Sequence, residues 1–174
     1  MIDPSQAKIS VLTRGVQGTP FNFSHKFREH ESIQEDLGMT LVRLSEITPG
    51  GILVFFSSYN MLKRHYEFWE EHKIIKQLEK IKGVYQEPRE SSHYKFVISA
   101  YYQDIQSGKG AIIFAVCRGK ISEGLDFSDD AARAVILVGI PYPLVIDPKT
   151  IMKKYYLDNK SYNAHKLSGQ KWYC

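Results

Sequence analysis

The stretch GAIIFAVCRGKISEGLDFSD, residues 110–129, places a charged, glycine-broken loop directly behind an apolar run. The run AIIFAV, residues 111–116, is short and continuous, which is typical of a strand that a sheet buries on both faces. Such strands occur in parallel sheets that helices cover, and the loops that follow them lie at one edge of the sheet. The stretch therefore predicts an α/β fold.

Other segments repeat this order of strand, polar turn and helix. GILVFF, residues 51–56, is a second strand candidate, and Ser57 or Ser58 is placed to cap the helical pattern of residues 57–81. Apolar residues at three- and four-residue steps predict a helix over residues 31–47. The remaining candidates are strands at residues 9–16, 83–88 and 134–140 and helices at residues 93–105 and 148–157. Strands that alternate with helices predict a doubly wound α/β domain with a parallel sheet.

The composition is that of a globular domain. Hydrophobic residues make up 43% of the 174 residues and charged residues 24%, which argues against disorder. No apolar run approaches the roughly 18 residues that a membrane span needs, and the first residues lack the pattern of a signal peptide. We therefore expect an intracellular protein. The net charge of +4 is compatible with a polyanionic partner but is equally common in proteins that bind none.

The two cysteines, Cys117 and Cys174, are too few for a disulfide framework, a four-thiolate zinc site or an iron–sulfur cluster. One interpretation of Cys117 is a nucleophile in an unrelated nucleotide-binding enzyme. A catalytic thiol needs a base, and none of the six histidines lies near Cys117 in the sequence. A buried thiol at the end of a strand is the better interpretation.

The loop after residues 111–116 carries groups that suit phosphate and sugar. These groups are cations, a hydroxyl, acceptors and glycines: Arg118, Lys120, Ser122, Glu123, Asp126, Gly119 and Gly124. The cations and the hydroxyl suit phosphate, the carboxylates suit ribose hydroxyls, and the glycines let the backbone approach a ligand. The alternative is a solvated crossover whose charges pair with one another. Taken by itself, the loop favours this plainer interpretation.

A second polar turn changes that balance. Residues 57–60 follow the strand candidate at residues 51–56, so both turns are expected at the same edge of the sheet. Alone, the second turn would be interpreted as a helix cap. Two such turns at one edge favour a nucleotide or nucleic-acid site.

These stretches resemble motifs of a known family. AVCRGKISEGLDFSDDAARAVILVGIPYP, residues 115–143, is similar to motif V and the following strand of the XPD-like superfamily 2 DNA helicases, the iron–sulfur helicases of the DEAH type. GGILVFFSSYN, residues 50–60, resembles their motif IV. EFWEEH, VYQEPR and LSGQKWY follow in the family's order and spacing, so the resemblance covers about residues 9–173. The sequence EGLDFSDD is similar to the branch of telomere elongation regulators and Fanconi anaemia group J helicases.

The resemblance implies that residues 1–174 are the second RecA-like motor domain of an ATP-dependent DNA helicase, a three-layer α/β domain with a mainly parallel sheet between helices. It implies no catalytic or metal-binding residue in this chain. It implies a nucleotide-binding set and a set that holds the single-stranded DNA backbone: Glu123, Gly124 and Asp126 for the nucleotide, and Ser57, Ser58, Tyr59, Arg118, Lys120 and Ser122 for DNA.

The resemblance further implies the ligands and partners of a longer parent protein. ATP and Mg²⁺ bind between this domain and the first RecA-like motor domain, and an iron–sulfur cluster belongs to the parent's first half. The partners are single-stranded DNA and that first motor domain, with no membrane, and the location is nuclear. The parent unwinds DNA 5′ to 3′ in DNA repair or telomere maintenance.

Two kinds of family motif are not found in the sequence. It contains neither the phosphate-binding pattern G-x-x-x-x-G-K-[ST] nor the magnesium-binding acidic box, and Q-x-x-G-R-x-x-R, motif VI, does not follow GQKWY. We therefore expect a C-terminally truncated domain, from a fragment, a splice form or a truncated gene model, that alone neither hydrolyses ATP nor unwinds DNA. The alternative function is a non-catalytic module that binds single-stranded DNA or a protein.

Overall fold

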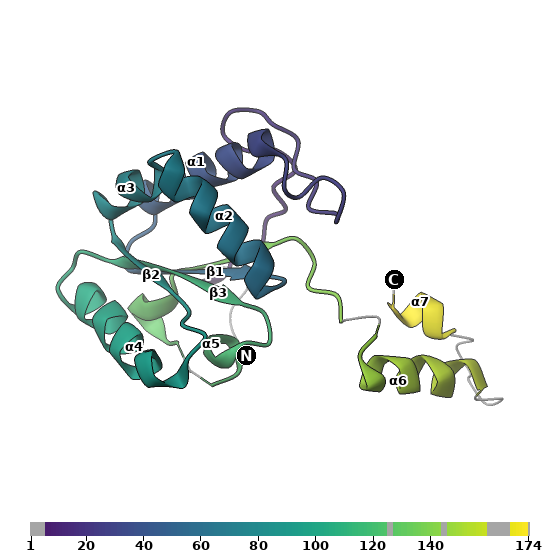
Figure 1. Cartoon of the computed structure of the whole chain (residues 1–174). Helices are drawn as coiled ribbons and strands as arrows, with labels where there is room; N and C mark the ends of the chain where they lie inside the picture. The colour runs from purple at the N-terminus through teal and green to yellow at the C-terminus, as the bar shows by residue number, and fades with distance from the viewer. Residues whose placement is uncertain (1–5, 125–126, 144–145, 160–167, 174) are drawn as a thin grey trace. The chain divides into compact units, whose positions relative to one another are not determined.

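The structure is a computed structural model that describes residues 6–124, 127–143, 146–159 and 168–173. The chain forms two compact units, Met1–Ile140 and Pro141–Cys174. Figure 1 shows the helices and strands of both units.

The first unit is built around a parallel sheet of four strands in the described residues. In chain order these are β1 (Gly51–Phe56), β2 (Gly83–Gln86), β3 (Ala111–Val116) and β4 (Ala134–Val138). Their order across the sheet is β2-β3-β1-β4, and every pair is parallel. Phe56 pairs with both Val116 and Val138, so β1, β3 and β4 end at the same level. This common level forms the carboxyl edge of the sheet.

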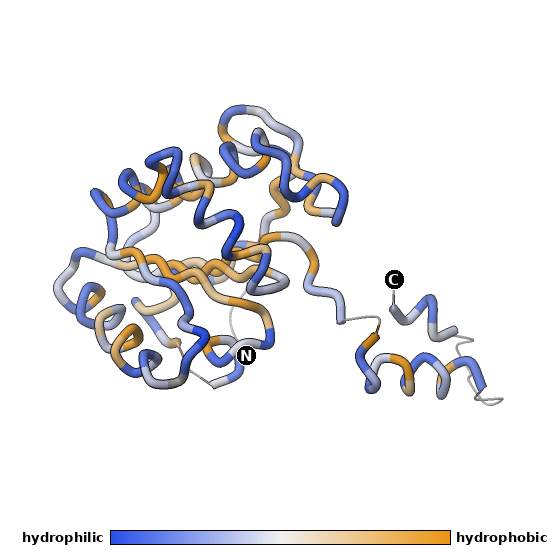
Figure 2. Tube along the Cα trace, in the orientation of Figure 1, coloured by the Kyte–Doolittle hydropathy of each residue, from blue (hydrophilic) through white to orange (hydrophobic). Residues whose placement is uncertain are grey.

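Helices cover both faces of the sheet, which makes three layers (Figure 1). One face carries α1 (Glu31–Ile47), α2 (Tyr59–Glu71) and α3 (Ile74–Glu79), and the other carries α4 (Ser91–Gln106), α5 (Lys120–Gly124) and the short 3₁₀ helix η2 (Asp129–Ala132). Figure 2 shows hydrophobic residues concentrated in the strands and hydrophilic residues along the helices. The predicted α/β fold with a parallel sheet between helices is therefore confirmed.

Alternate strand residues supply the two cores. Ile52, Val54 and Phe56 of β1 pack beneath α1, α2 and α3, whereas Leu53 packs on the side of α4. Every residue of β3 is buried, as the apolar run predicts. Burying each large side chain contributes about 1.5–3 kcal/mol, so this double-faced burial provides most of the driving force for the sheet.

Trp69 joins the helices of the first layer. Its side chain is fully buried, and its indole N–H donates to the carbonyl oxygen of Gln34 in α1 at 2.7 Å. Gly38 of α1 permits this contact, since a Cβ atom there would lie 2.6 Å from the Trp69 nitrogen.

The predicted strand at residues 9–16 is wrong. Ile9 is 95% exposed and Val11 is 87% exposed, and the segment forms one isolated antiparallel bridge, between Arg14 and Pro20. Asp36 of α1 holds the turn that follows, because its carboxylate accepts from the amides of residues 17 and 19. The apolar residues of this segment thus have no sheet partner within the described part of the chain.

Two further predictions need correction. The helical pattern of residues 57–81 is divided into α2 and α3, because Lys73 adopts a left-handed conformation with φ of 62°. The last strand, β4, lies at an edge of the described sheet and is covered on one face only. Its residues Val135 and Leu137 are 58% and 60% exposed.

The second unit contains α6 (Pro148–Asn159) and α7 (Gly169–Tyr173). The predicted helix at residues 148–157 is therefore confirmed. The ammonium groups of Lys153 and Lys154 in α6 lie 4.4 Å from the ring centre of Trp172 and 3.8 Å from that of Tyr173. Across both units, no described helix is long and apolar enough to cross a membrane.

Candidate functional site

The two polar turns predicted at one edge leave the sheet side by side. Phe56 and Val116 are partners at the ends of β1 and β3. Beyond this pair, the amide of Cys117 donates to the carbonyl oxygen of Phe56 at 2.8 Å. The prediction that residues 57–60 and 117–124 share one edge is therefore confirmed.

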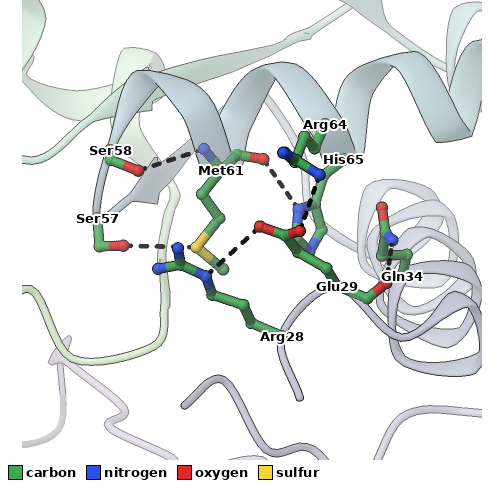
Figure 3. A network of polar contacts seen from close by, with 8 residues as sticks. All are labelled: Arg28, Glu29, Gln34, Ser57, Ser58, Met61, Arg64 and His65. Atoms are coloured by element: carbon green, nitrogen blue, oxygen red, sulfur yellow. Dashed lines mark hydrogen bonds and ion pairs between the residues drawn. The ribbon is translucent and has the colours of Figure 1, made fainter. Parts of the chain in front are cut away.

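The first turn is ordered by the start of α2. The Ser58 hydroxyl caps the helix by accepting from the amide of Met61 at 3.2 Å, and the Ser57 hydroxyl donates to the Met61 sulfur at 3.4 Å (Figure 3). Both serines and Tyr59 are half-buried. The serines therefore have a local structural role, whatever else they contact.

The second turn, residues 117–124, carries the predicted cations on an unusual backbone. Arg118 is exposed and adopts a left-handed conformation with φ of 63°, which is uncommon for any residue except glycine. Lys120 begins the short helix α5, and its ammonium donates to the carbonyl oxygen of Arg89 at 3.3 Å. The Ser122 hydroxyl donates to the Gly119 carbonyl oxygen at 3.0 Å. The loop is thus bonded both internally and to the segment after β2.

Glu87, directly after β2, was not among the predicted site residues. Its side chain is buried at the same edge, and its carboxylate accepts from the amides of Val116 at 2.8 Å and Ile121 at 3.2 Å. The available signal was the short strand candidate within VYQEPR, because an acid after a parallel strand lies at the carboxyl edge.

Tyr59 and Arg89 form the border of this edge. The Arg89 guanidinium lies 5.6 Å from the centre of the Tyr59 ring. Burial raises the pKa of the Tyr59 hydroxyl, and the neighbouring Glu87 carboxylate raises it further. A cleft of about 390 Å³ opens here, lined by residues that include Tyr59, Lys63, Tyr66, Glu67, Glu87 and Arg89.

The predicted nucleotide-binding residues lie at the far end of the same loop. Glu123 and Gly124 are exposed at the end of α5. A Cβ atom at Gly124 would meet nothing nearer than the Tyr94 hydroxyl at 3.9 Å, so the backbone there is open to close approach. Asp126 lies outside the described residues. Within the described ranges, no group of three or more His, Cys, Asp or Glu residues could hold a metal ion.

Cys117 does not have the environment of a nucleophile. Its thiol is half-buried, and burial raises its pKa above the ordinary value. Because the reactive form of cysteine is the thiolate, a raised pKa disfavours catalysis by this residue.

The fold defines a class of protein first. The solved structure of an XPD helicase matches with a TM-score of 0.55 and 22% identity, over 81% of this chain and 22% of that chain. At this identity the match shows the fold alone, and that fold is a RecA-like α/β domain.

The sequence comparisons then identify the family. Residues 41–174 match the helicase C-terminal domain, and this chain belongs to that family. Regulator of telomere elongation helicase 1 of Rattus norvegicus is 40% identical over 179 residues, which covers 99% of this chain and 14% of the relative. The homologue from Aedes aegypti is 40% identical over 176 residues, which covers 99% of this chain and 17% of the relative. These matches confirm the predicted XPD-like helicase family and its telomere-regulator branch.

The chain spans about 14–18% of the length of the curated relatives that it matches. It therefore corresponds to a helicase part, and its similarity covers the C-terminal helicase domain.

Proposed function

We propose that this chain is the second RecA-like motor domain of an ATP-dependent DNA helicase, and that its carboxyl-edge loops hold single-stranded DNA. The observation that carries this proposal is the hydrogen bond from Cys117 to Phe56, which joins the starts of the loops at residues 57–60 and 117–124. Family membership supplies the supporting argument.

The residues that would contact DNA offer groups for the sugar–phosphate backbone. Arg118 and Lys120 provide cations, and the hydroxyl of Ser122 lies on the same short helical turn as Lys120. On the neighbouring loop, Ser57, Ser58 and Tyr59 provide hydroxyls and one aromatic ring. Contacts of this kind fix the position of a strand and carry little sequence preference.

The nucleotide end of the site consists of Glu123, Gly124 and Asp126. The Glu123 carboxylate suits ribose hydroxyls, and the open space at Gly124 suits close approach of a ligand. The same loop would then hold DNA near its start and the nucleotide near its end. This arrangement couples the nucleotide state to the grip on DNA.

ATP with Mg²⁺ would supply phosphoryl transfer when bound between this domain and the first motor domain of the parent. The 174 residues contain no phosphate-binding pattern G-x-x-x-x-G-K-[ST] and two cysteines. They therefore do not fit an iron–sulfur cluster, which we assign to the first half of the parent. We further assign the parent to the nucleus, to 5′ to 3′ unwinding, and to DNA repair or telomere maintenance.

The test is binding of the 174-residue chain to a fluorescent single strand of thymidines, measured by anisotropy at several salt concentrations. The Arg118→Ala/Lys120→Ala variant should bind more weakly, with a slope of log affinity against log salt that is shallower by roughly 1.4 for two lost phosphate contacts. The control is Arg43→Ala/Lys76→Ala, which removes two exposed cations from α1 and α3. Salt-independent binding, or equal loss in both variants, would contradict the proposal.

A non-catalytic module that binds single strands would use the same residues. Turnover separates the two functions, because a full-length parent that binds single strands without DNA-stimulated ATP hydrolysis would be a binding module. This experiment needs the longer protein, whereas the anisotropy test does not.

A further inference from the structure

Glu87 spans the start of the loop at residues 117–124. Its oxygen Oε2 accepts from the amide of Val116, the last residue of β3, and Oε1 accepts from the amide of Ile121 in α5. Its own amide donates to the carbonyl oxygen of Phe114 at 2.8 Å. One side chain therefore holds the loop at both ends of its first turn.

The loop closes tightly around this carboxylate. Glu87 is only 3% exposed, and a Cβ atom at Gly119 would lie 2.6 Å from its Oε1. Burying a carboxylate is unfavourable unless it is hydrogen-bonded, and hydrogen bonds to an ionised acceptor are stronger than neutral ones. The carboxylate and the two amides thus stabilise each other, and no larger residue fits at position 119.

Arg118 lies between the two amides that Glu87 accepts from. A left-handed conformation is unfavourable for arginine and persists only where the surrounding structure enforces it. The bonds to residues 116 and 121 supply this constraint on both sides of Arg118. The direction of the Arg118 side chain is therefore set by Glu87.

The segment after β2 also contacts the other residues of the DNA set. The Arg89 guanidinium stacks on Tyr59, and the Arg89 carbonyl oxygen accepts from the Lys120 ammonium. Residues 87–89 thus lie between a residue of the first turn and two residues of the second. A charge at position 87 influences all three.

We propose that Glu87 is a positioning residue that fixes residues 117–124 and Tyr59 in the single arrangement that grips the sugar–phosphate backbone of single-stranded DNA. This inference rests on the proposed function for its DNA part. The hydrogen bonds on which it depends can be tested without DNA.

The first experiment measures amide hydrogen exchange in the Glu87→Gln variant of the 174-residue chain. Glutamine keeps the shape but replaces one acceptor oxygen with a donor, so one of the two amides loses its partner. Exchange at residues 117–124 should accelerate about tenfold, whereas exchange in β1 should not change. Unchanged exchange at residues 117–124 would overturn the inference, whatever the DNA result.

The second experiment measures affinity for the same fluorescent thymidine strand. Glu87→Gln should weaken binding about fivefold or more in the wild-type background. It should have no further effect in the Arg118→Ala/Lys120→Ala background, because Glu87 acts through those side chains. Unchanged affinity despite faster loop exchange, or additive losses in the two backgrounds, would overturn the positioning role.

Asp36→Asn is the matched control. Asp36 is fully buried and, like Glu87, its carboxylate accepts from two loop amides, at residues 17 and 19. This variant should loosen the turn at residues 17–19 and leave DNA affinity unchanged. An equal loss of affinity in Asp36→Asn would mean that general destabilisation, and not loop position, explains the result.

Gly119→Ala is a second variant in case Glu87→Gln does not fold. It keeps the carboxylate and displaces it, so it should change loop exchange and DNA affinity in the same direction. Normal affinity in Gly119→Ala would count against the inference. Failure of the wild-type chain to bind single strands would overturn the proposed function and the DNA part of this inference, and the exchange data would still decide whether Glu87 orders the loop.

Discussion

The guanidinium of Arg89 lies over the aromatic ring of Tyr59, 5.6 Å from its centre. The pair brings together the segment after β2 and the first turn of α2, which are 30 residues apart by number. It places a cation and a half-buried aromatic side chain at the border of the cleft on the carboxyl edge. Aromatic rings and cations are the groups on which single-stranded nucleic acids stack and pair.

Tyr59→Ala should weaken binding to a thymidine strand by roughly tenfold, because a lost base–aromatic stack costs about 1–3 kcal/mol. Tyr59→Phe keeps the ring and is the control, so its affinity should stay near that of the wild type. Anisotropy titrations at one fixed salt concentration measure both. Equal affinity in the Ala variant and the wild type would show that the ring contacts no base.

Ser58→Ala should lower the free energy of unfolding by about 1 kcal/mol, since it removes the side-chain acceptor at the start of α2. Ser57→Ala should have a smaller effect, because the Ser57 hydroxyl donates to a thioether sulfur, which is a weak acceptor. Urea unfolding followed by circular dichroism compares the two variants. A larger loss in Ser57→Ala would contradict the assignment of Ser58 as the cap.

Stability should fall in mild acid because of His65. Burial lowers the pKa of this imidazole to about 4, against 6.5 for an exposed histidine (Figure 3). Its Nδ1–H donates to the Met61 carbonyl oxygen, and its Nε2 has no hydrogen-bond partner among the described residues. The neutral form is therefore favoured in the folded state, although Glu29 raises this pKa slightly and Arg28 lowers it.

The sign follows from the lowered pKa. The stabilisation is fully present above pH 6.5 and is lost progressively as the pH falls towards 4, by up to about 3 kcal/mol. Urea unfolding at pH 7 and pH 5 should show a larger loss for the wild type than for His65→Leu. Carboxylates titrate in both proteins, so the difference between them isolates His65. Identical pH dependence would mean that the folded chain tolerates the charged imidazole.

Gly38→Ala should destabilise the first unit by about 1–3 kcal/mol. The new Cβ atom would lie 2.6 Å from the indole nitrogen of Trp69, which is fully buried and has no space to move. Alanine is otherwise better than glycine inside a helix by about 1 kcal/mol, so the clash must outweigh that gain. Thermal unfolding decides the sign, and a more stable Gly38→Ala variant would show that α1 and α2 can separate at no cost.

The 174-residue chain should release no phosphate from ATP, with or without saturating single strands, because it contains no G-x-x-x-x-G-K-[ST] pattern. A coupled phosphate assay with a nuclease-treated preparation measures this. DNA-stimulated hydrolysis that survives further purification would refute the motor-domain assignment.

The parts of the fold that the sequence predicts best are those with one dominant signal. The limits of β1, β3 and α1 match the prediction, because continuous apolar runs and a helical period are both strong patterns. The segment at residues 9–16 has an equally apolar composition but remains exposed. A strand requires a partner, and the pattern of one segment does not report whether a partner exists.

The candidate site was predictable in its location but not in its wiring. Parallel strands place their following loops at one edge, so the turns after β1 and β3 could be assigned to the same site from sequence. The role of Glu87 depends on which amides lie within reach of a single carboxylate. Likewise, the break between α2 and α3 depends on the backbone of Lys73, a residue with no special preference for a left-handed conformation.

The matched ends of β1 and β3 have a mechanical consequence. A pull on the loop at residues 117–124 is transmitted along the strand axis, where it is shared by every backbone pair from Gly51–Ala111 to Phe56–Val116. Shear of this kind loads many hydrogen bonds at once, whereas peeling would break them singly. The sheet of this protein is thus oriented to carry tension and to move as one rigid piece with whatever its loops hold.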